Sequence, residues 1–443
     1  MNRRNFLTTM SVGGLGLLAL SAFPSFADDD GITSPIQFPV PTNTGIKGNI
    51  VIVGGGMAGV TVAKYLRLWG GHEVNVTLVE KSASYTSNIM SNTVLTGQRT
   101  ISSLAYAYST LADHYGVNLV TKEVKEIGSN SILLGDGSTI NSYDKLILAP
   151  GLEFDLMPGM SDVTQYETDV PHAWKAGSQT ELLRTQLENM LDGTDVVMTI
   201  PKVPYRCPPG PYERACVIAD WLKTNKLNSK LIVLDANTDI VVEKDNFNLA
   251  FTKTHAGVIN YRPGCQITNV DINTGIVTFT QNGVSEDITP GVFNPIPPQR
   301  APQLLKDADL LDDTGFAPVN VLSYESTKTP GIHIIGDASN TTMPKAGHIG
   351  NQQAKTCADA ILRLLQNQAP DPAPVTNSAC YTPITSTTAT WLSAVYQYDP
   401  GTGKMVIPAQ HNVNKPISAT TATTDNYKDM LIWFNTLMGD TFA

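Results

Sequence analysis

The sequence predicts an α/β fold in which two dinucleotide-binding domains of the Rossmann type lie in tandem and a smaller domain caps them. Three observations lead to this prediction. A glycine-rich turn follows a strand that begins near residue 48, two further strands (195–200 and 230–235) recur without such a turn, and a proline-rich connector occupies 367–374. The expected layout is a leader (1–27), an extended arm (28–47), a first domain in two pieces (48–160 and 288–370), an inserted second domain (161–287) and a C-terminal cap (371–443).

The N-terminus is typical of an export signal. Arg3 and Arg4 precede a short apolar run (10–22), and Ser25-Phe26-Ala27 offers a small-x-small cleavage site. The run is too short to span a bilayer, and no later stretch approaches about 18 uninterrupted apolar residues, so we expect no transmembrane anchor in the mature chain. The sequence therefore predicts export by the twin-arginine pathway to the periplasm, and a retained N-terminal anchor is the alternative.

The composition is that of a globular protein. Of the 443 residues, 42% are hydrophobic and 16% charged, which excludes a disordered or fibrous chain. The net charge of −10 becomes −12 without residues 1–27, which contain two arginines and no acidic residue. Such a surface disfavours nucleic acid and suits a basic patch on a partner.

Cysteine and histidine patterns limit the metal chemistry. There are five cysteines, an odd number, so at least one thiol is left without a partner within the chain in an oxidising compartment. No Cys-x-x-Cys or Cys-x-x-Cys-His motif is present, and the seven histidines form no cluster with ligand spacing. We therefore expect no metal site and no c-type haem on this chain.

The glycine-rich turn is the first dinucleotide motif. Gly54 would make the tight turn, Gly56 would let backbone amides approach a pyrophosphate, and Gly59 would allow close packing of helix on strand. Glu80, at the end of the next strand, is placed to accept hydrogen bonds from a ribose diol. A glycine-rich turn that binds nothing is the alternative. The residues expected to bind the dinucleotide here are Gly54, Gly56, Met57, Ala58, Gly59, Glu80 and Lys81.

Two later strands favour FAD over NAD as the dinucleotide. The strand at 143–148 ends in a turn of small residues, and the strand at 331–335 delivers Asp337. Both segments resemble the flavin-contacting segments of glutathione-reductase-like flavoproteins, in which the aspartate binds the ribityl chain. Asp337 could also be the N-cap of the helix that follows. The further residues expected around the cofactor are Asn88, Ala149, Pro150, Gly151, Gly336, Asp337, Lys345 and Gly347.

The second nucleotide fold lacks a nicotinamide motif. Its first strand (195–200) is followed by Pro201-Lys202-Val203-Pro204, where the glycines should be, so we expect no nicotinamide binding. A cysteine loop, 204–214, replaces the glycine turn, and a reductant that reacts at this loop is the expected electron source.

From residue 49 to residue 443 the chain resembles the flavoprotein subunit of flavocytochrome c sulfide dehydrogenase, a family related to the sulfide:quinone oxidoreductases. The loop Cys-Pro-Pro-Gly-Pro-Tyr-Glu-Arg is the most specific of the matching segments. The segments that carry the resemblance are 172–177, 204–215, 294–300, 343–348, 379–381, 433–435 and 440–442.

The resemblance implies a redox-active disulfide between Cys207 and Cys380, an active-site acid at Glu213, and a separate c-type cytochrome as the electron acceptor. Hydrosulfide would attack one sulfur and release the other as a thiolate, which would pass electrons to the flavin. Lys345 would help to stabilise the reduced flavin. In this family FAD is often linked covalently to a cysteine, but Ser87 stands at the matching position, so we expect non-covalent FAD.

Several alternatives remain open at this stage. The cysteine pair could be a structural disulfide, and Glu213 could be an ordinary acid of the first helical turn. Cys216 and Cys357 are expected in the core, and Cys265 has no assigned role. The chain could instead pass electrons to a quinone, oxidise a thiol or persulfide, or be a binding subunit in which FAD is purely structural. The acceptor, the sulfur product and the oligomeric state stay open.

Overall fold

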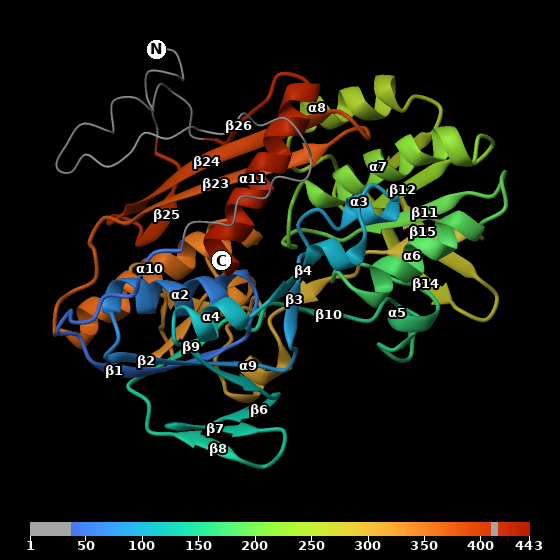
Figure 1. Cartoon of the computed structure of the whole chain (residues 1–443). Helices are drawn as coiled ribbons and strands as arrows, with labels where there is room; N and C mark the ends of the chain where they lie inside the picture. The colour runs from blue at the N-terminus through green and yellow to red at the C-terminus, as the bar shows by residue number, and fades with distance from the viewer. Residues whose placement is uncertain (1–36, 409–414) are drawn as a thin grey trace. The chain divides into compact units, whose positions relative to one another are not determined.

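The computed structural model describes residues 37–408 and 415–443. The predicted leader, with the twin-arginine pair, and the first part of the predicted arm (28–36) lie outside these residues. Within them the chain forms two large sheets built around parallel strands, one of eight and one of four strands, together with a four-stranded C-terminal sheet and smaller sheets of two or three strands (Figure 1). None of the helices in these two ranges combines the length and the hydropathy that a membrane span requires.

The first sheet has eight strands, and its centre is parallel. Branched apolar residues form these central strands because both faces of the sheet are covered. The two segments 48–148 and 317–340 both supply strands to it, so the chain leaves this sheet and returns. The strand order is β22 (Ser339–Asn340), β19 (Ala317–Asn320), β20 (Glu325–Ser326), β21 (Ile332–Ile334), β9 (Lys145–Leu148), β1 (Gly48–Val53), β2 (Val74–Glu80) and β5 (Asn118–Thr121).

Two helices pack against each other beside the first sheet. α2 (Met57–Gly70) and α10 (Gly347–Leu365) lie together over strands β1 and β2 (Figure 1). Both begin next to the carboxyl ends of the parallel strands, since α2 follows β1 directly and α10 follows the segment after β21. Helix N-termini at this edge favour a bound anion.

The second sheet is fully parallel, with register Val196↔Leu231 between its two central strands. Its order is β13 (Ile259–Pro263), β12 (Leu231–Asp235), β11 (Val196–Ile200) and β17 (Val292–Pro295). The helices associated with it are α6 (Ser178–Asn189), α7 (Gly210–Asn225) and the short α8 (Lys244–Leu249). Two parallel sheets of this kind confirm the predicted tandem Rossmann-type fold.

The C-terminal sheet is antiparallel and brings Cys380 to the rest of the molecule. Its strands are β23 (Val375–Pro383), β24 (Ala389–Asp399), β25 (Lys404–Val406) and β26 (Ile417–Ser418), and α11 (Thr424–Phe442) follows them. β23 packs against both α10 and α7, so this strand touches helices of both large sheets.

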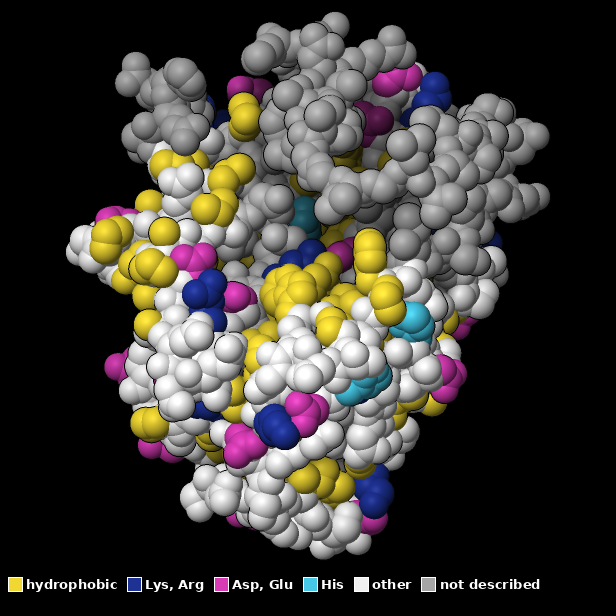
Figure 2. Space-filling model, turned by 60° about the vertical axis from the view of Figure 1, so that its left-hand side comes forward, with side chains coloured by type: hydrophobic (Ala, Val, Ile, Leu, Met, Phe, Trp, Pro, Cys, Tyr) yellow, Lys and Arg dark blue, Asp and Glu magenta, His cyan; other side chains and the backbone are white. Residues whose placement is uncertain are grey.

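The remaining strands belong to separate sheets of two or three strands. They are β3 (Ser84–Thr86), β4 (Ala105–Ala107), β6 (Val124–Ile127), β7 (Ser131–Leu134), β8 (Thr139–Asn141), β10 (Glu153–Phe154), β14 (Cys265–Asp271), β15 (Ile276–Gln281), β16 (Val284–Ile288) and β18 (Gln299–Arg300). The short helices are α3 (Asn92–Leu95), α4 (Ser109–Asp113), α5 (Gln165–Thr168), α9 (Gln303–Asp307), η1 (Ile101–Leu104), η2 (Ala250–Thr254) and η3 (Gly336–Ala338). On the described part of the face in Figure 2, acidic and basic side chains are interspersed.

Candidate functional site

The glycine turn after β1 leaves open space at the start of α2. A Cβ at Gly54, whose φ is +105°, would lie 2.3 Å from the carbonyl oxygen of Ala149, and a Cβ at Gly59 would lie 1.8 Å from the carbonyl oxygen of Gly54. At Gly56 a Cβ would meet nothing closer than the Tyr85 ring, at 4.0 Å. Gly54 and Gly59 are therefore required by the protein's own packing, whereas Gly56 faces open space. This cradle fits the pyrophosphate of a dinucleotide.

Glu80 closes one side of the cradle. Its carboxylate accepts hydrogen bonds from the backbone N–H groups of Gly55 (2.7 Å) and Ser82 (3.0 Å). The Tyr108 hydroxyl donates to the Gly55 carbonyl (2.9 Å), which fixes the turn from the other side. The acid thus lies beside the glycine turn, within reach of a ribose on the same side. Lys81 is exposed at the end of β2.

The segment after β21 lies against the same turn. A Cβ on Gly336, with φ +75°, would be 3.2 Å from the Cβ of Ala58, and the Gly336 N–H donates to Gln353 Oε1 (2.7 Å). Met57 and Ala58 are buried in the first turn of α2, and Ala149 is buried at the end of β9. Pro150 is half-buried beside it, and Gly151 has φ +74°.

Asp337 lies in the short turn η3 and is largely buried, which raises the pKa of its carboxyl. The Arg206 guanidinium lies 3.9 Å from this carboxylate. The charges of Arg206 and Lys345 lower the pKa of Asp337, but they only partly offset the effect of burial. The alternative role of Asp337 as a helix N-cap is wrong, because α10 begins ten residues later at Gly347, with Ala346 as its N-cap.

Lys345 joins the two large sheets. Its Nζ donates to the carbonyl oxygens of Asp337 (2.8 Å) and Ser339 (3.1 Å) and lies 3.5 Å from the centre of the Phe316 ring. Burial lowers the pKa of this amine to about 8. Its backbone carbonyl accepts the N–H of Cys207 at 2.7 Å. Lys345 thereby connects the Asp337 segment to the cysteine loop.

Two other predicted residues lie in neighbouring segments. Asn88 follows β3, and its Oδ1 accepts a hydrogen bond from the Ala176 N–H (2.8 Å). Asn88 and Asp337 both shift the pKa of the Tyr85 hydroxyl, so both residues lie near Tyr85. Gly347 is the first residue of α10, where a Cβ would approach Ile89 Cδ1 at 3.0 Å. Ser87 is buried and its Oγ donates to the Ile89 carbonyl at 3.1 Å.

Cys207 and Cys380 come together from two different sheets. Cys207 lies between β11 and α7 with φ +57°, and its carbonyl accepts the Gly210 N–H (2.8 Å). Cys380 lies in the middle of β23, opposite Leu392 of β24. Both are free thiols in the structure. The interaction with Cys207, followed by burial, raises the pKa of the Cys380 thiol well above its usual value, so the two side chains lie within reach of each other.

The strand that carries Cys380 is attached to α10 by a histidine. The Ala379 N–H donates to His348 Nδ1 at 3.0 Å, and burial lowers the pKa of that imidazole. The neutral ring can therefore accept this bond. Trp433 of α11 lies beside both His348 and Tyr381, with ring centres 6.2 and 5.6 Å away.

Glu213 lies in the first turn of α7, shortly after Cys207, and is 8% exposed. Its charge also acts on Cys380. Asn92 Nδ2 donates to its Oε1 at 2.8 Å, but burial dominates and raises the pKa of the carboxyl to about 7. A group that titrates near neutral pH can accept and return a proton during turnover. This ionisation is compatible with the active-site role, although Glu213 is also an acid of a first helical turn.

Arg214 is a site residue that sequence analysis missed. It is 1% exposed, and its guanidinium donates to the carbonyls of His172 (2.7 Å) and Ala173 (2.6 Å) and to the side chains of Asn92 (2.8 Å) and Asn294 (3.1 Å). It also lies over the Trp174 ring, 4.6 Å from its centre. The only available signal was its place beside Glu213 in the cysteine loop motif.

The charges around the two cysteines differ. Arg214 and Cys207 are close enough that their charges affect each other, whereas Cys380 is flanked by the carboxyls of Glu213 and Glu243. A thiolate is therefore disfavoured at Cys380.

The other three cysteines are buried and lie in the hydrophobic core. Cys216 and Cys357, predicted to be core residues, have no exposed surface, and Cys265 is 2% exposed at the start of β14. Burial is the main reason that the pKa values of the Cys216 and Cys265 thiols are raised.

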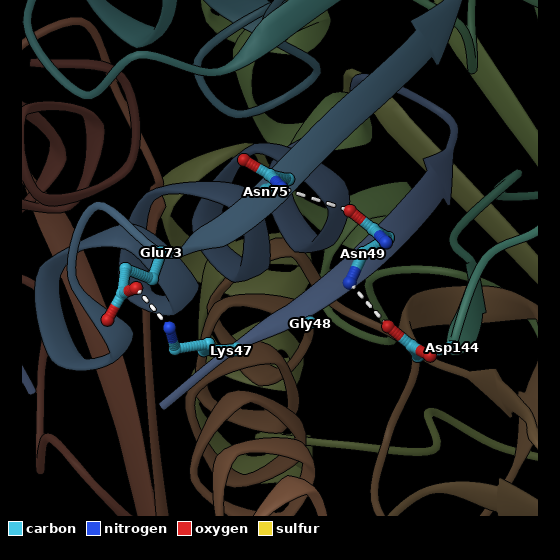
Figure 3. Close-up of a pocket in the computed structure, with 6 residues that line it drawn as sticks. All are labelled: Lys47, Gly48, Asn49, Glu73, Asn75 and Asp144. Atoms are coloured by element: carbon cyan, nitrogen blue, oxygen red, sulfur yellow. Dashed lines mark hydrogen bonds and ion pairs between the residues drawn. The ribbon is translucent and has the colours of Figure 1, made fainter. Parts of the chain in front are cut away.

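An open pocket of about 400 Å³ lies at the other end of the first sheet (Figure 3). Its polar groups are paired with one another: Lys47 with Glu73 (2.7 Å), the Asn49 N–H with Asp144 (2.7 Å), and Asn75 with Asn49 (3.0 Å). It lies at the amino ends of β1 and β2, whereas dinucleotides bind at the carboxyl ends of parallel strands.

Comparisons with known families match two parts of the chain. The model described as "Sulfide dehydrogenase [flavocytochrome c] flavoprotein chain, central" matches residues 180–297. The model described as pyridine nucleotide-disulphide oxidoreductase matches residues 48–189. Among curated proteins, the mitochondrial sulfide:quinone oxidoreductase of Mus musculus is 24% identical over 349 residues, which are 72% of each chain.

Solved structures with the same fold cover most of the chain. The sulfide:quinone oxidoreductase of Aquifex aeolicus superposes with a TM-score of 0.71 at 16% identity and covers 89% of this chain and 92% of its own. Putidaredoxin reductase, in its covalent complex with putidaredoxin, has a TM-score of 0.61 at 19% identity, with 79% and 82% covered. These matches confirm the fold of a pyridine nucleotide-disulphide oxidoreductase.

Proposed function

Because the chain is a flavoprotein subunit related to the sulfide:quinone oxidoreductases, we propose that it is an FAD-dependent sulfide dehydrogenase that acts at Cys207 and Cys380 and passes electrons to a c-type cytochrome. The observation that carries the proposal is that these two thiols, one in the loop before α7 and one on β23, lie within reach of each other next to the Lys345 and Asp337 segment. A structural disulfide would not require this position beside a cofactor cradle.

Residues of the chain would hold FAD without a covalent bond. The turn at Gly54, Gly56 and Gly59 would hold the pyrophosphate, Glu80 the ribose, and Asp337 the ribityl chain. When bound, FAD supplies the oxidant that accepts two electrons from the cysteine pair. Ser87 has no thiol with which to form a thioether, and its hydroxyl is already hydrogen-bonded to Ile89.

In the oxidised protein the two cysteines form a disulfide, which hydrosulfide attacks. We place the attack at the sulfur of Cys380: a new S–S bond forms there, the Cys207–Cys380 bond breaks, and Cys207 leaves as a thiolate. Arg214 stabilises that thiolate, whereas the carboxyls near Cys380 disfavour one on the other sulfur. The proton brought by hydrosulfide stays on the persulfide of Cys380 or passes to the Glu213 carboxylate, whose pKa of about 7 allows this.

Turnover then needs a nucleophile to remove the outer sulfur. A second hydrosulfide takes it as hydrodisulfide, which leaves Cys380 as a thiol and Cys207 as a thiolate. This dithiol pair gives up two electrons and one proton to return to the disulfide. Glu213 is placed to accept that proton.

Anaerobic titration of the FAD-loaded protein with sulfide, followed by flavin absorbance, tests the proposal. Wild type and a Cys265→Ala control should bleach, whereas Cys207→Ala and Cys380→Ala should keep an oxidised spectrum. Equal bleaching in either site variant would exclude the cysteine mechanism. An unreduced flavin in the wild type would reject sulfide as the substrate and favour another thiol, a persulfide or a purely structural FAD.

The electron acceptor is tested separately. We propose export to the periplasm and a separate cytochrome, so the sulfide-reduced protein should reduce cytochrome c faster than it reduces a soluble quinone. The opposite preference would make the chain a sulfide:quinone oxidoreductase, the activity in the name of its Mus musculus relative.

A further inference from the structure

A second, half-buried acid acts on Cys380. Glu243 precedes α8 in the second sheet's domain, and its backbone is left-handed, with φ +48° and ψ +38°. A glutamate adopts this region only at a cost in conformational energy. This strained turn directs the Glu243 side chain towards the C-terminal sheet rather than towards solvent.

Three donors, two of them from the C-terminal sheet, hold the Glu243 carboxyl. Thr390 Oγ1 donates to Oε1 at 2.9 Å, Thr382 Oγ1 donates to Oε2 at 3.3 Å, and Asn246 Nδ2 lies 3.4 Å from Oε1. These bonds favour the ionised carboxyl, whereas burial raises its pKa. The neighbouring Lys244 pairs with Asp239 at 2.6 Å instead. Among the described residues, no ion pair neutralises Glu243.

The carboxyl lies close to the reactive sulfur. Thr382 is two residues beyond Cys380 on β23, so both side chains lie on one face of the strand, and Thr390 is the partner of Thr382 across the ladder. Glu243 is one of the charges that raise the pKa values of Cys380 and of Glu213.

The groups that face Glu243 from the packed elements are acidic or neutral. α7 presents Glu213 and Cys216, β23 presents Cys380 and Thr382, and β24 presents Thr390. The charged groups that act most on Cys380 are Cys207, Glu213 and Glu243, and none of these three is a cation. A negative charge at Glu243 therefore acts on Cys380 in the same direction as the charge of Glu213.

We propose that Glu243 is a positioning residue that acts through Cys380: its half-buried negative charge keeps Cys380 in the thiol form, so that the thiolate of the reduced pair is located on Cys207. This role of Glu243 rests on the proposed function, in which Cys207 is the leaving group and Cys380 is the sulfur that hydrosulfide attacks. The ionisation itself can be measured without sulfide.

The test is site-resolved alkylation of the FAD-loaded protein after reduction with a phosphine. Iodoacetamide labelling of Cys380, quantified by mass spectrometry over a series of pH values, reports its thiolate fraction. The wild-type midpoint should lie above the usual thiol pKa of about 8.5. In Glu243→Gln the midpoint should fall by about one unit, which gives about tenfold more labelling at a fixed pH below it.

Three further variants separate charge from packing. Glu243→Asp, which keeps the charge and tolerates the left-handed backbone, should stay close to wild type. Asp245→Asn removes an exposed charge from the same short helix and should leave the curve unchanged. Thr390→Val removes a donor that favours the ionised Glu243, so its curve should move in the direction of Glu243→Gln.

Coincident curves for wild type and Glu243→Gln, in proteins with native near-ultraviolet circular dichroism, would overturn the inference. So would a shift in Asp245→Asn as large as that in Glu243→Gln. A shifted curve together with a flavin that sulfide does not reduce would leave the inference standing and reject the proposed function.

Discussion

Replacement of Glu213 by glutamine should change how the protein's stability depends on pH. Burial raises the pKa of this carboxyl from 4.5 to about 7, and its neutral form keeps the hydrogen bond from Asn92. A rise of about 2.5 units corresponds to about 3.4 kcal/mol at about 1.36 kcal/mol per unit. This figure is the free energy that the native state loses, relative to the unfolded chain, when the buried carboxyl must ionise.

The sign follows from the protons bound in each state. Between pH 4.5 and about 7 the native protein holds a proton that the unfolded chain has released, so the contribution of Glu213 to stability is present below pH 4.5, falls as the pH rises, and is lost above about 7. Glu213→Gln does not titrate. As the pH rises from 4.5 to about 7, the free energy of unfolding of Glu213→Gln should therefore increase by about 3 kcal/mol relative to that of the wild type.

Urea unfolding of both proteins near pH 4.5 and above pH 7 measures this change. The exposed Glu181 of α6 provides a matched control, because Glu181→Gln removes the same group from a solvated position. The infrared band of a protonated carboxyl should also disappear from the wild type near pH 7 and be absent from Glu213→Gln. A stability difference that is equal at both pH values would refute the reasoning.

Three further outcomes follow from the geometry. Gly56→Ala should fold but lose bound FAD, measured as the ratio of flavin to protein absorbance, whereas Gly59→Ala should lose stability as well, because its Cβ would lie 1.8 Å from the Gly54 carbonyl oxygen. Arg214→Lys cannot satisfy the four acceptors of the guanidinium, so its free energy of unfolding should fall by about 3 kcal/mol in denaturant titrations. Lys345→Met should lower the midpoint potential of bound flavin, measured against a reference dye, because a cation near the cofactor is lost. An unchanged potential would show that the charge of Lys345 does not act on the flavin.

The sequence was sufficient for the parts of the site that depend on local structure. The turn at Gly54, Gly56 and Gly59 could be predicted because strand, turn, helix and acid follow one another within one unit. The second sheet could be predicted from its apolar strands. The partnership of Cys207 with Cys380 came only from family resemblance, because nothing local connects two residues so far apart in the chain.

The residues that sequence analysis missed act through tertiary contacts. Arg206 lies in a loop, Asn92 in the short α3 and Arg214 in the first turns of α7, and no periodicity in the sequence marks these polar side chains as buried. Glu243 is similar: the two residues after it are exposed, and the threonines that bind it are more than a hundred residues away. Only the docking of the C-terminal strands reveals that its carboxyl is enclosed.

The attachment of β23 to α10 through His348 and Ala379 has a consequence for shortened forms of the protein. The end of the chain also completes the core around the first sheet, because residues of β24, β25 and α11 belong to the same hydrophobic cluster as the strands β1 and β2 and the helix α2. Phe442 stacks on the Tyr85 ring, which borders the glycine cradle, with 5.0 Å between the ring centres. A protein that ended before β23 would therefore lose the second sulfur and, with it, part of the support of its cofactor cradle.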